Sequence, residues 1–161
     1  MNSAKRLAAA VLDTSAICCV FEQDAGAQAF LEAFNRCDQL LMSAGTLAEL
    51  SILMMSRAGS AGAQALDKFL VANGVEVVEV DRRLVESQFR TGFMAFGKGM
   101  GNLAKLNYGD LFAYALACEK GLPLLFQGLD FKHTDLKSAM SELGYAINRK
   151  GEPRIARRRA G

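Results

Sequence analysis

The run Leu7–Leu12 most constrains how this chain can fold, because it places six apolar residues in a row directly before Asp13. A short, unbroken apolar run is typical of a strand that is covered on both faces of a parallel sheet. The run is too short for the apolar part of a signal sequence, and no other stretch approaches the length of a membrane span. We therefore expect a soluble, cytoplasmic protein with a buried strand near its N-terminus.

Extended and helical patterns alternate along the rest of the chain, which predicts an α/β fold with a mainly parallel sheet. Thr14 or Ser15, Asp24, Ser43 and Asp81 are candidate helix caps, and Gly59 is a candidate helix end. Segment 128–147 is expected to hold a turn, a short strand and a helix. Further strands are expected at 39–43, 75–80 and 124–127, and helices at 14–21, 25–34, 46–56, 61–72, 82–96 and 108–118.

The length of 161 residues fits one domain with its own core, which we place at 1–147. Residues 148–161 form a basic tail that is predicted to be mobile. The four cysteines include no C-x-x-C pair, so they are interpreted as reduced, buried thiols. The single histidine, His133, excludes cleavage by a pair of histidines.

The net charge of +2 hides two unlike parts of the chain. Residues 148–161 hold six basic residues and one acidic residue, a charge of +5, whereas the remaining residues carry −3. The tail is therefore either a solvated end or an arm that grips RNA or a protein partner.

Four carboxylates, Asp13, Glu49, Asp110 and Asp130, each stand alone in an otherwise uncharged stretch. Burying a carboxylate without a partner is costly, and these stretches contain no lysine or arginine to offset it. Taken singly, Asp13 could cap a helix, Asp110 could face a helix dipole and Asp130 could be a loop residue. Taken together, the four acids indicate an external cation.

The places of these acids along the chain support a shared site. Asp13 and Asp130 follow predicted strands, and ligands of open α/β sheets bind beyond the carboxyl ends of the strands. Asp110 lies in the first turn of its predicted helix, and Glu49 lies about one turn into another. Ligation by oxygen atoms alone suits Mg²⁺ or Mn²⁺.

Four segments that carry these acids also carry a family resemblance. In order, they are Val11-Leu-Asp-Thr-Ser-Ala16, Thr46-Leu-Ala-Glu-Leu50, Leu106-Asn-Tyr-Gly-Asp-Leu-Phe-Ala-Tyr-Ala-Leu-Ala117 and Pro123-Leu-Leu-Phe-Gln-Gly-Leu-Asp-Phe131. Together they resemble the PIN domain, specifically the VapC-type ribonuclease toxins of bacterial toxin–antitoxin pairs. The resemblance covers residues 8–140 and implies a three-layer αβα sandwich with a mainly parallel central sheet, hence a PIN-like nuclease domain at 1–147.

The resemblance implies a Mg²⁺- or Mn²⁺-dependent endoribonuclease. Asp13, Glu49, Asp110 and Asp130 match the acidic metal-binding quartet of the family, and Asp135 matches a supporting acid. In such enzymes a water activated by the metal cleaves the RNA phosphodiester and leaves a 5′-phosphate and a 3′-hydroxyl. The expected partners are an RNA substrate, a cognate VapB-type antitoxin and a second copy of the chain in a homodimer.

Two further surfaces could contact these partners. The loop 97–105 lacks the last glycine and the preceding strand of a dinucleotide site. It is therefore either a flexible surface loop or a loop whose Lys98 and Lys105 contact RNA phosphates. Helices 16–34 and 47–55 carry more apolar residues than one buried face requires, which suggests a homodimer or antitoxin interface.

Two other functions remain open from the sequence. One is a catalytically inactive PIN-like module that binds RNA or protein. The other is an aspartate-based phosphotransfer protein with Asp13 as nucleophile, but dehalogenase-type phosphatases carry a second Asp where this chain has Ser15.

Overall fold

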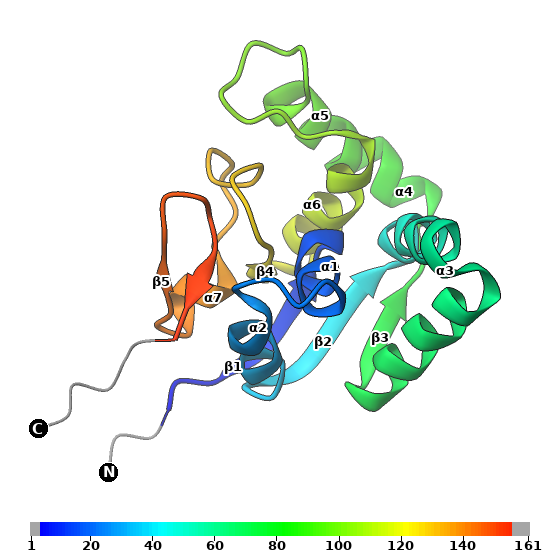
Figure 1. The fold of residues 1–161 in the computed structure, drawn as a ribbon. Coiled ribbons are helices and arrows are strands. Elements are labelled where there is room, and N and C mark those ends of the chain that lie inside the picture. The colour runs from blue at the N-terminus through cyan, green and yellow to red at the C-terminus, as the bar shows by residue number, and fades with distance from the viewer. Residues whose placement is uncertain (1–3, 156–161) are drawn as a thin grey trace, which may run out of the picture.

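A computed structural model describes residues 4–155 of the chain. Its central sheet is parallel, with the strand order β3-β2-β1-β4 (Figure 1). The inner strands are β1 (Leu7–Leu12) and β2 (Cys37–Ser43), and the edge strands are β3 (Val75–Val78) and β4 (Leu124–Leu125). The helices are α1 (Thr14–Phe21), α2 (Ala27–Phe34), α3 (Ala44–Ala72), α4 (Arg82–Leu84), α5 (Arg90–Phe96), α6 (Tyr108–Lys120) and α7 (Ala139–Glu142), with one π-helical turn, Val85–Phe89, between α4 and α5.

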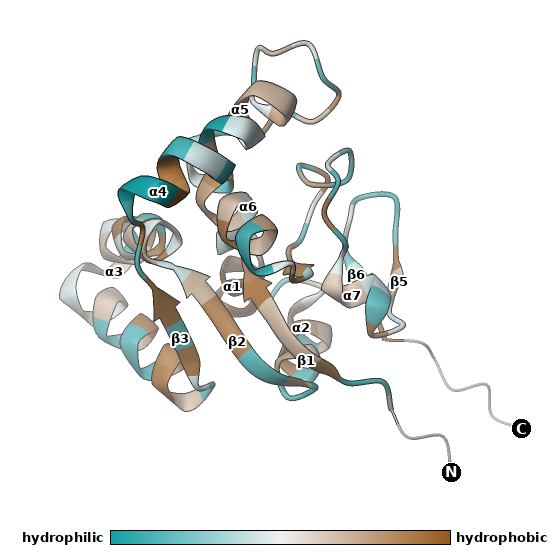
Figure 2. Cartoon of the chain, turned by 180° about the vertical axis from the view of Figure 1, so that it is seen from behind, coloured by the Kyte–Doolittle hydropathy of each residue, from teal (hydrophilic) through white to brown (hydrophobic). Residues whose placement is uncertain are grey.

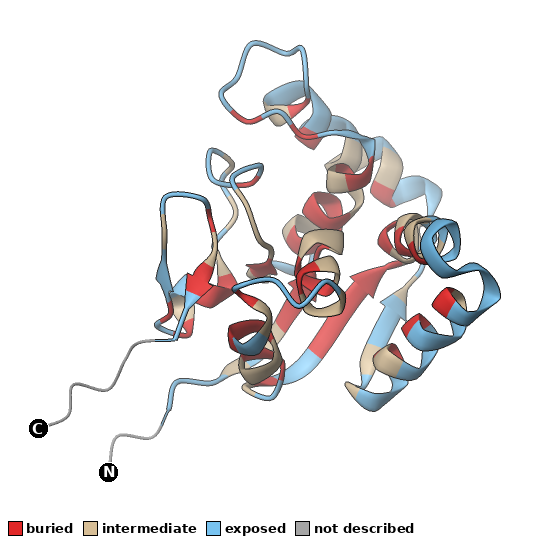
Figure 3. Ribbon diagram, viewed as in Figure 1, coloured by how far each residue is buried: buried red, intermediate tan, exposed pale blue. Residues whose placement is uncertain are grey.

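Helices cover both faces of the sheet, because alternate residues of a strand point to opposite faces. Ala10 and Leu12 belong to a core shared with α1, α2, α3 and α7, whereas Val11 belongs to a second core shared with α6. All three side chains are fully buried, and Figure 3 shows the buried strands between helices with exposed outer surfaces. This arrangement confirms the predicted α/β fold with three layers.

The break in α3 lies where the sequence predicts a helix end. The two expected helices are joined into one span, but Ala58 and Gly59 have non-helical backbone angles. Gly59 has a φ of 58°, which glycine adopts at little cost. The part of α3 after this kink can therefore turn and pack along β3.

Both edge strands are shorter than the sequence predicts. β3 ends at the pair Ser43–Val78, because Ser43 leaves the sheet there to cap α3. β4 ends at Leu125, since the amide of Gln127 donates to the Ser15 hydroxyl at 3.0 Å instead of extending the strand. This second contact draws the chain after β4 toward the start of α1.

Two helix starts differ from the expected caps. The N-cap of α1 is Asp13, not Thr14 or Ser15, because the Asp13 carboxylate accepts the backbone N–H of Ser15. The helix α2 begins after Gly26, and the side chain of Asp24 makes no capping bond to it. The predicted caps Ser43 and Asp81 are both confirmed.

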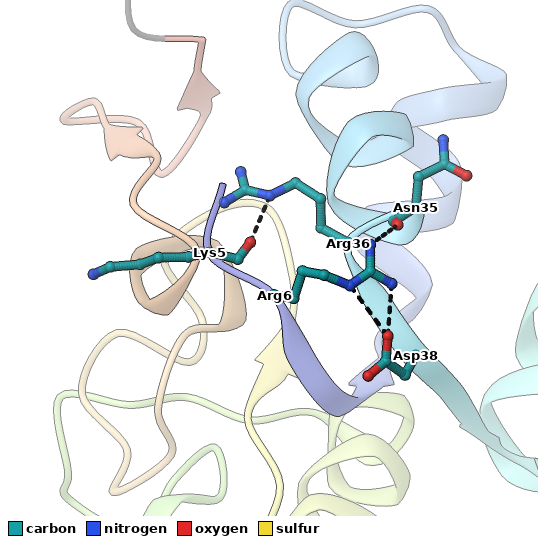
Figure 4. A network of polar contacts seen from close by, with 5 residues as sticks. All are labelled: Lys5, Arg6, Asn35, Arg36 and Asp38. Carbon is teal, nitrogen blue, oxygen red and sulfur yellow. Dashed lines mark hydrogen bonds and ion pairs between the residues drawn. The ribbon is translucent and has the colours of Figure 1, made fainter. Parts of the chain in front are cut away.

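The start of β1 is tied to β2 by an exposed polar network (Figure 4). Arg6 donates to one oxygen of Asp38 at 3.2 and 2.6 Å and to the Asn35 carbonyl at 3.1 Å. Arg36 donates to the Lys5 carbonyl at 2.8 Å. Exposed pairs contribute little stability, so the effect of this network is to align the two strands where they begin.

The C-terminal part of the described chain forms a small hairpin. The helix α7 precedes the strand β5 (Ala146–Ile147), so the expected order of strand and helix is reversed. β5 pairs antiparallel with β6 (Pro153–Arg154). The predicted boundary between residues 147 and 148 therefore falls inside this hairpin, and the end of the predicted tail, 156–161, lies outside the described residues.

The predicted apolar surplus is divided unevenly between the two segments. Figure 2 shows apolar residues concentrated along the strands. The large apolar side chains of 16–34 are buried or half-buried against the core, so this segment offers no exposed apolar face. In contrast, Ile52 and Met55 of α3 are 71% and 52% exposed. Within 4–155, none of the helices has the length and apolar character needed to cross a membrane.

We expect Gly151→Ala to loosen the C-terminal hairpin. Gly151 has a φ of 78°, its carbonyl accepts the Gly128 N–H at 3.1 Å, and a Cβ would overlap the Gly128 carbonyl. The matched control is Gly99→Ala, because Gly99 also has a positive φ but no atom lies near its missing Cβ.

The free energy of unfolding of Gly151→Ala should fall by about 1–3 kcal/mol more than that of the control. Amide exchange at Gly128 should also accelerate. Equal losses in the two variants would contradict the packing of the hairpin against the 128–132 loop.

Candidate active site

Asp13 occupies the carboxyl end of β1 and is almost fully buried, at 3% exposure. One carboxylate oxygen accepts both the backbone N–H of Ser15 at 3.0 Å and its hydroxyl at 2.6 Å. The other oxygen, Oδ1, is buried without a hydrogen-bond partner. Burial is the main cause that raises the pKa of Asp13 to about 6. The capping role therefore accounts for one oxygen of this carboxylate and leaves the other oxygen without a bonding partner.

Glu49 reaches the site from the first turns of α3. Its Oε2 accepts the Thr14 hydroxyl at 2.8 Å, which links α3 to the residue that follows Asp13. The backbone of Gly109 packs directly against the Glu49 carboxylate, since a Cβ at that position would overlap it. Glu49 is thus held between the N-terminal ends of α1 and α6.

Asp110 lies in the first turn of α6, in a reciprocal capping box with Asn107. Each residue accepts the backbone N–H of the other at 2.9 Å. Burial is the main cause that raises the pKa of Asp110 to about 7, and the charges of Asp13, Asp130 and Glu49 raise it further. Asp110 is therefore close enough to the other three acids to feel their charges.

The two remaining acids have different surroundings. Asp130 is exposed in the loop after β4, and its charge acts on Asp110. Asp135 accepts the Tyr114 hydroxyl at 3.0 Å and lines a separate cavity with Cys118. Asp135 is not among the groups that shift the pKa of Asp13 or Asp110. Its supporting role in the site therefore stays a prediction.

The acids suit a divalent cation by their chemistry. Among residues 4–155, no three Asp, Glu, His or Cys side chains are already grouped tightly enough to enclose a metal ion. The buried Oδ1 of Asp13 nevertheless lacks any donor, and the acids raise one another's proton affinity. A positive ion among them would relieve both costs, and carboxylate oxygens are ligands that Mg²⁺ and Mn²⁺ accept. Asp13, Glu49 and Asp110 could hold such an ion, with Asp130 at the edge.

The predicted basic residues lie on the loop beside this site. Lys98 lines an apolar groove together with Asn107 and Tyr108, next to the start of α6. Lys105 is exposed farther along the same loop. Lys98 therefore lies beside the start of the helix that carries Asp110, and Lys105 shortly precedes Asn107, the N-cap of that helix.

Sequence reasoning missed the residues that orient the acids. Thr14 and Ser15 were expected as caps, but their hydroxyls bind Glu49 and Asp13. Their position directly after Asp13 is the only signal in the sequence. The cysteines are free, as predicted, but Cys18 and Cys118 are only partly buried, contrary to the prediction. Burial still raises the pKa of Cys18 to about 11, so this thiol is poorly suited as a nucleophile.

Comparison with known families places these acids within one family match. The PIN domain family matches residues 10–137, a range that contains every acid considered above. The chain belongs to the PIN domain family. Ribonuclease VapC42 of Mycobacterium tuberculosis is 38% identical over 131 residues, which cover 80% of this chain and 98% of that protein. Ribonuclease VapC30 of the same species is 36% identical over 126 residues, covering 78% and 95%.

Solved structures have the same fold. VapC20 of Mycobacterium tuberculosis, described as a toxin that cleaves the sarcin-ricin loop, superposes with a TM-score of 0.63 at 19% identity and covers 78% of this chain and 95% of its own. VapBC2 from Rickettsia felis, bound to a promoter DNA fragment, gives a TM-score of 0.60 at 18% identity and covers 81% and 96%. These structures confirm the PIN architecture, and the identities in sequence place the chain among the VapC-type PIN domains.

We expect the metal-free protein to lose stability as pH rises from about 4 to about 7. Asp13 and Asp110 have pKa values of about 6 and about 7 in the folded state, above the ordinary value of 3.8. In this interval the folded state binds more protons than the unfolded state, so the free energy of unfolding falls as protons are lost.

Asp110→Asn should remove part of this loss, since the amide keeps the capping bond and carries no charge. In EDTA, urea unfolding should show the variant to be about 1–2 kcal/mol more stable than the unaltered chain at pH 7.5, after allowance for solvent screening, but not at pH 4. A constant difference at both pH values would show that ionisation of Asp110 does not oppose folding.

Proposed function

We propose that this chain is a Mg²⁺-dependent endoribonuclease, the toxin of a VapBC-type toxin–antitoxin pair. The observation that carries the proposal is the buried, unpartnered Oδ1 of Asp13 at the carboxyl end of β1. Asp13, Glu49 and Asp130 all lie close enough to Asp110 for their charges to raise its pKa. The chain is a PIN domain, and its relatives over nearly their whole length are named ribonucleases. An inactive binding module would have no need of a buried Asp13 and a partly buried Asp110 whose charged forms oppose its stability.

In this proposal Asp13, Glu49, Asp110 and Asp130 hold the cation. A bound Mg²⁺ supplies charge stabilisation at the scissile phosphate and lowers the pKa of the attacking water. Ser15 holds one oxygen of Asp13 so that the other points away from the cap, and Thr14 holds Glu49 in the same way. Asp110 must lose its proton before it can bind a cation, so metal affinity should rise with pH through about 7.

Asp13→Asn and Asp110→Asn test the site. Each replaces a carboxylate by an amide of nearly the same shape, so the fold should persist while cation binding fails. We expect Mg²⁺-dependent RNA cleavage to fall at least about 100-fold in each variant. Products of the unaltered chain should carry a 5′-phosphate and a 3′-hydroxyl.

Asp67→Asn is the matched control, because Asp67 is an exposed acid in the part of α3 after the kink at Gly59, whereas Glu49 lies before it. Its cleavage rate and its Mn²⁺ affinity by calorimetry should equal those of the unaltered chain. Full activity in both Asp13→Asn and Asp110→Asn would contradict the assignment of these acids to the metal site. Folded protein without any Mn²⁺ binding would instead favour the inactive module.

The partners follow from the same family. The solved neighbours include VapBC complexes bound to DNA, which supports a VapB-type antitoxin for this chain. The free cysteines and the RNA substrate support a cytoplasmic location. Met55 of α3 and Met94 of α5, 52% and 63% exposed, are available for the proposed homodimer, which light scattering on the purified chain would test.

A further inference from the structure

A cavity of about 350 Å³ opens between α3 and α6, directly beside the acids. Glu49 forms part of its wall, so the cavity borders the proposed metal site. Its only polar side-chain groups are the Glu49 carboxylate and the Tyr108 hydroxyl. The lining residues are Gly45, Ala48, Glu49, Ile52, Tyr108, Gly109 and Phe112.

Two glycines let the helices approach closely around this cavity. The Phe112 ring lies against Gly45, and the Glu49 carboxylate lies against Gly109. A Cβ at either glycine would overlap these groups. The Phe112 ring and the backbone of the two glycines therefore form part of the cavity wall.

Tyr108 stands at the mouth of this cavity and is 74% exposed. Its ring meets Phe112 edge-on, with centroids 5.0 Å apart at 89°, and meets Phe89 at 6.2 Å and 71°. Contacts of this kind hold the ring in place while much of its surface faces solvent. An exposed ring held by two others is suited to stacking on a planar ligand.

Tyr108 also borders a second groove, of about 400 Å³, that contains Lys98. The aromatic ring thus separates a groove that leads to a carboxylate of the metal site from one that leads to a lysine. A nucleic acid strand carries groups that match these three features. Its planar bases can stack on the ring, and the phosphates on either side of a base can bind a cation or a lysine. A single peptide side chain could fill the cavity, but it would not also contact both the Glu49 side and the Lys98 side of Tyr108.

We propose that Tyr108 is the stacking platform for an unpaired RNA base adjacent to the cleaved phosphate, with the base entering the cavity between α3 and α6 and Lys98 contacting a neighbouring phosphate. This inference rests on the proposed ribonuclease function. Because the cavity offers few hydrogen-bonding groups, the base is bound by stacking with little discrimination among bases. A base within a duplex cannot enter, so the nucleotide at this position must be unpaired.

Kinetics of Tyr108→Leu and Tyr108→Phe test this role. The leucine variant should raise KM for a single-stranded RNA about tenfold, with a smaller change in kcat, because stacking on an aromatic face is lost. The phenylalanine variant keeps the ring and should restore KM. Both should unfold at similar temperatures, since the side chain is largely exposed.

Fluorescence gives an independent readout, because the chain contains no tryptophan. In an Asp13→Asn background, which binds RNA without cleaving it, Tyr108→Trp should be quenched by single-stranded RNA and not by a duplex of the same sequence. The control is Val71→Trp, since Val71 is 82% exposed near the end of α3, shortly before β3 starts and thus at the other end of the sheet. Its emission should not respond to RNA.

The outcomes separate this inference from the proposed function. Unchanged KM in Tyr108→Leu together with normal cleavage would overturn the stacking role and leave the nuclease intact. Unchanged RNA kinetics with lost affinity for an apolar peptide would assign the cavity to a protein partner and also overturn it. Absence of RNA cleavage by the unaltered chain would overturn the proposed function and this inference with it.

Discussion

The hydrogen bonds around Asp13 and Ser15 are the contact on which the site depends. The Asp13 N–H donates to the Leu125 carbonyl at 3.0 Å, which joins the ends of β1 and β4. The Ser15 hydroxyl donates to Asp13 at 2.6 Å and accepts the Gln127 N–H at 3.0 Å. One small cluster thus ends β4, starts α1 and turns the chain toward the loop of Asp130. It also leaves one Asp13 oxygen without a partner, which is the group that a cation requires.

Two of the other acids are also held by only a few hydrogen bonds. Glu49 is oriented by Thr14, and Asp110 is oriented by Asn107, so each carboxylate is bonded on one side. Burial and mutual repulsion make the charged forms of Asp13 and Asp110 unfavourable without a cation. The fold therefore holds a charge arrangement that opposes its own stability. Such an arrangement is expected where function, and not folding, selects the residues.

The surface around these acids carries both apolar and basic groups that a ligand could contact. An apolar cavity with an exposed tyrosine lies on one side, and Lys98 lies beyond that ring. On the other side the hairpin carrying Arg149 and Lys150 packs through Gly151 against the loop that leads to Asp130. The acidic centre is thus flanked by groups that suit bases and phosphates, which explains how a chain with only a small net charge could bind RNA.

Much of the fold follows from local sequence patterns. The strand Leu7–Leu12, the break at Gly59 and the caps Ser43 and Asp81 depend on neighbouring residues only, and the structure confirms them. The four isolated acids could also be found in this way, because an unpaired charge within an apolar stretch is visible without knowing its surroundings.

The orientation of those acids was decided only by the tertiary structure. The bond from Thr14 to Glu49 spans 35 residues, and the cavity beside Tyr108 exists only where α3 and α6 approach each other. The same long-range packing shortened β4 and placed Asp135 against Tyr114. The sequence by itself determined which residues are candidates for the chemistry, because composition and spacing are local properties. Only the folded chain decided how those residues face one another, because that depends on packing between distant segments.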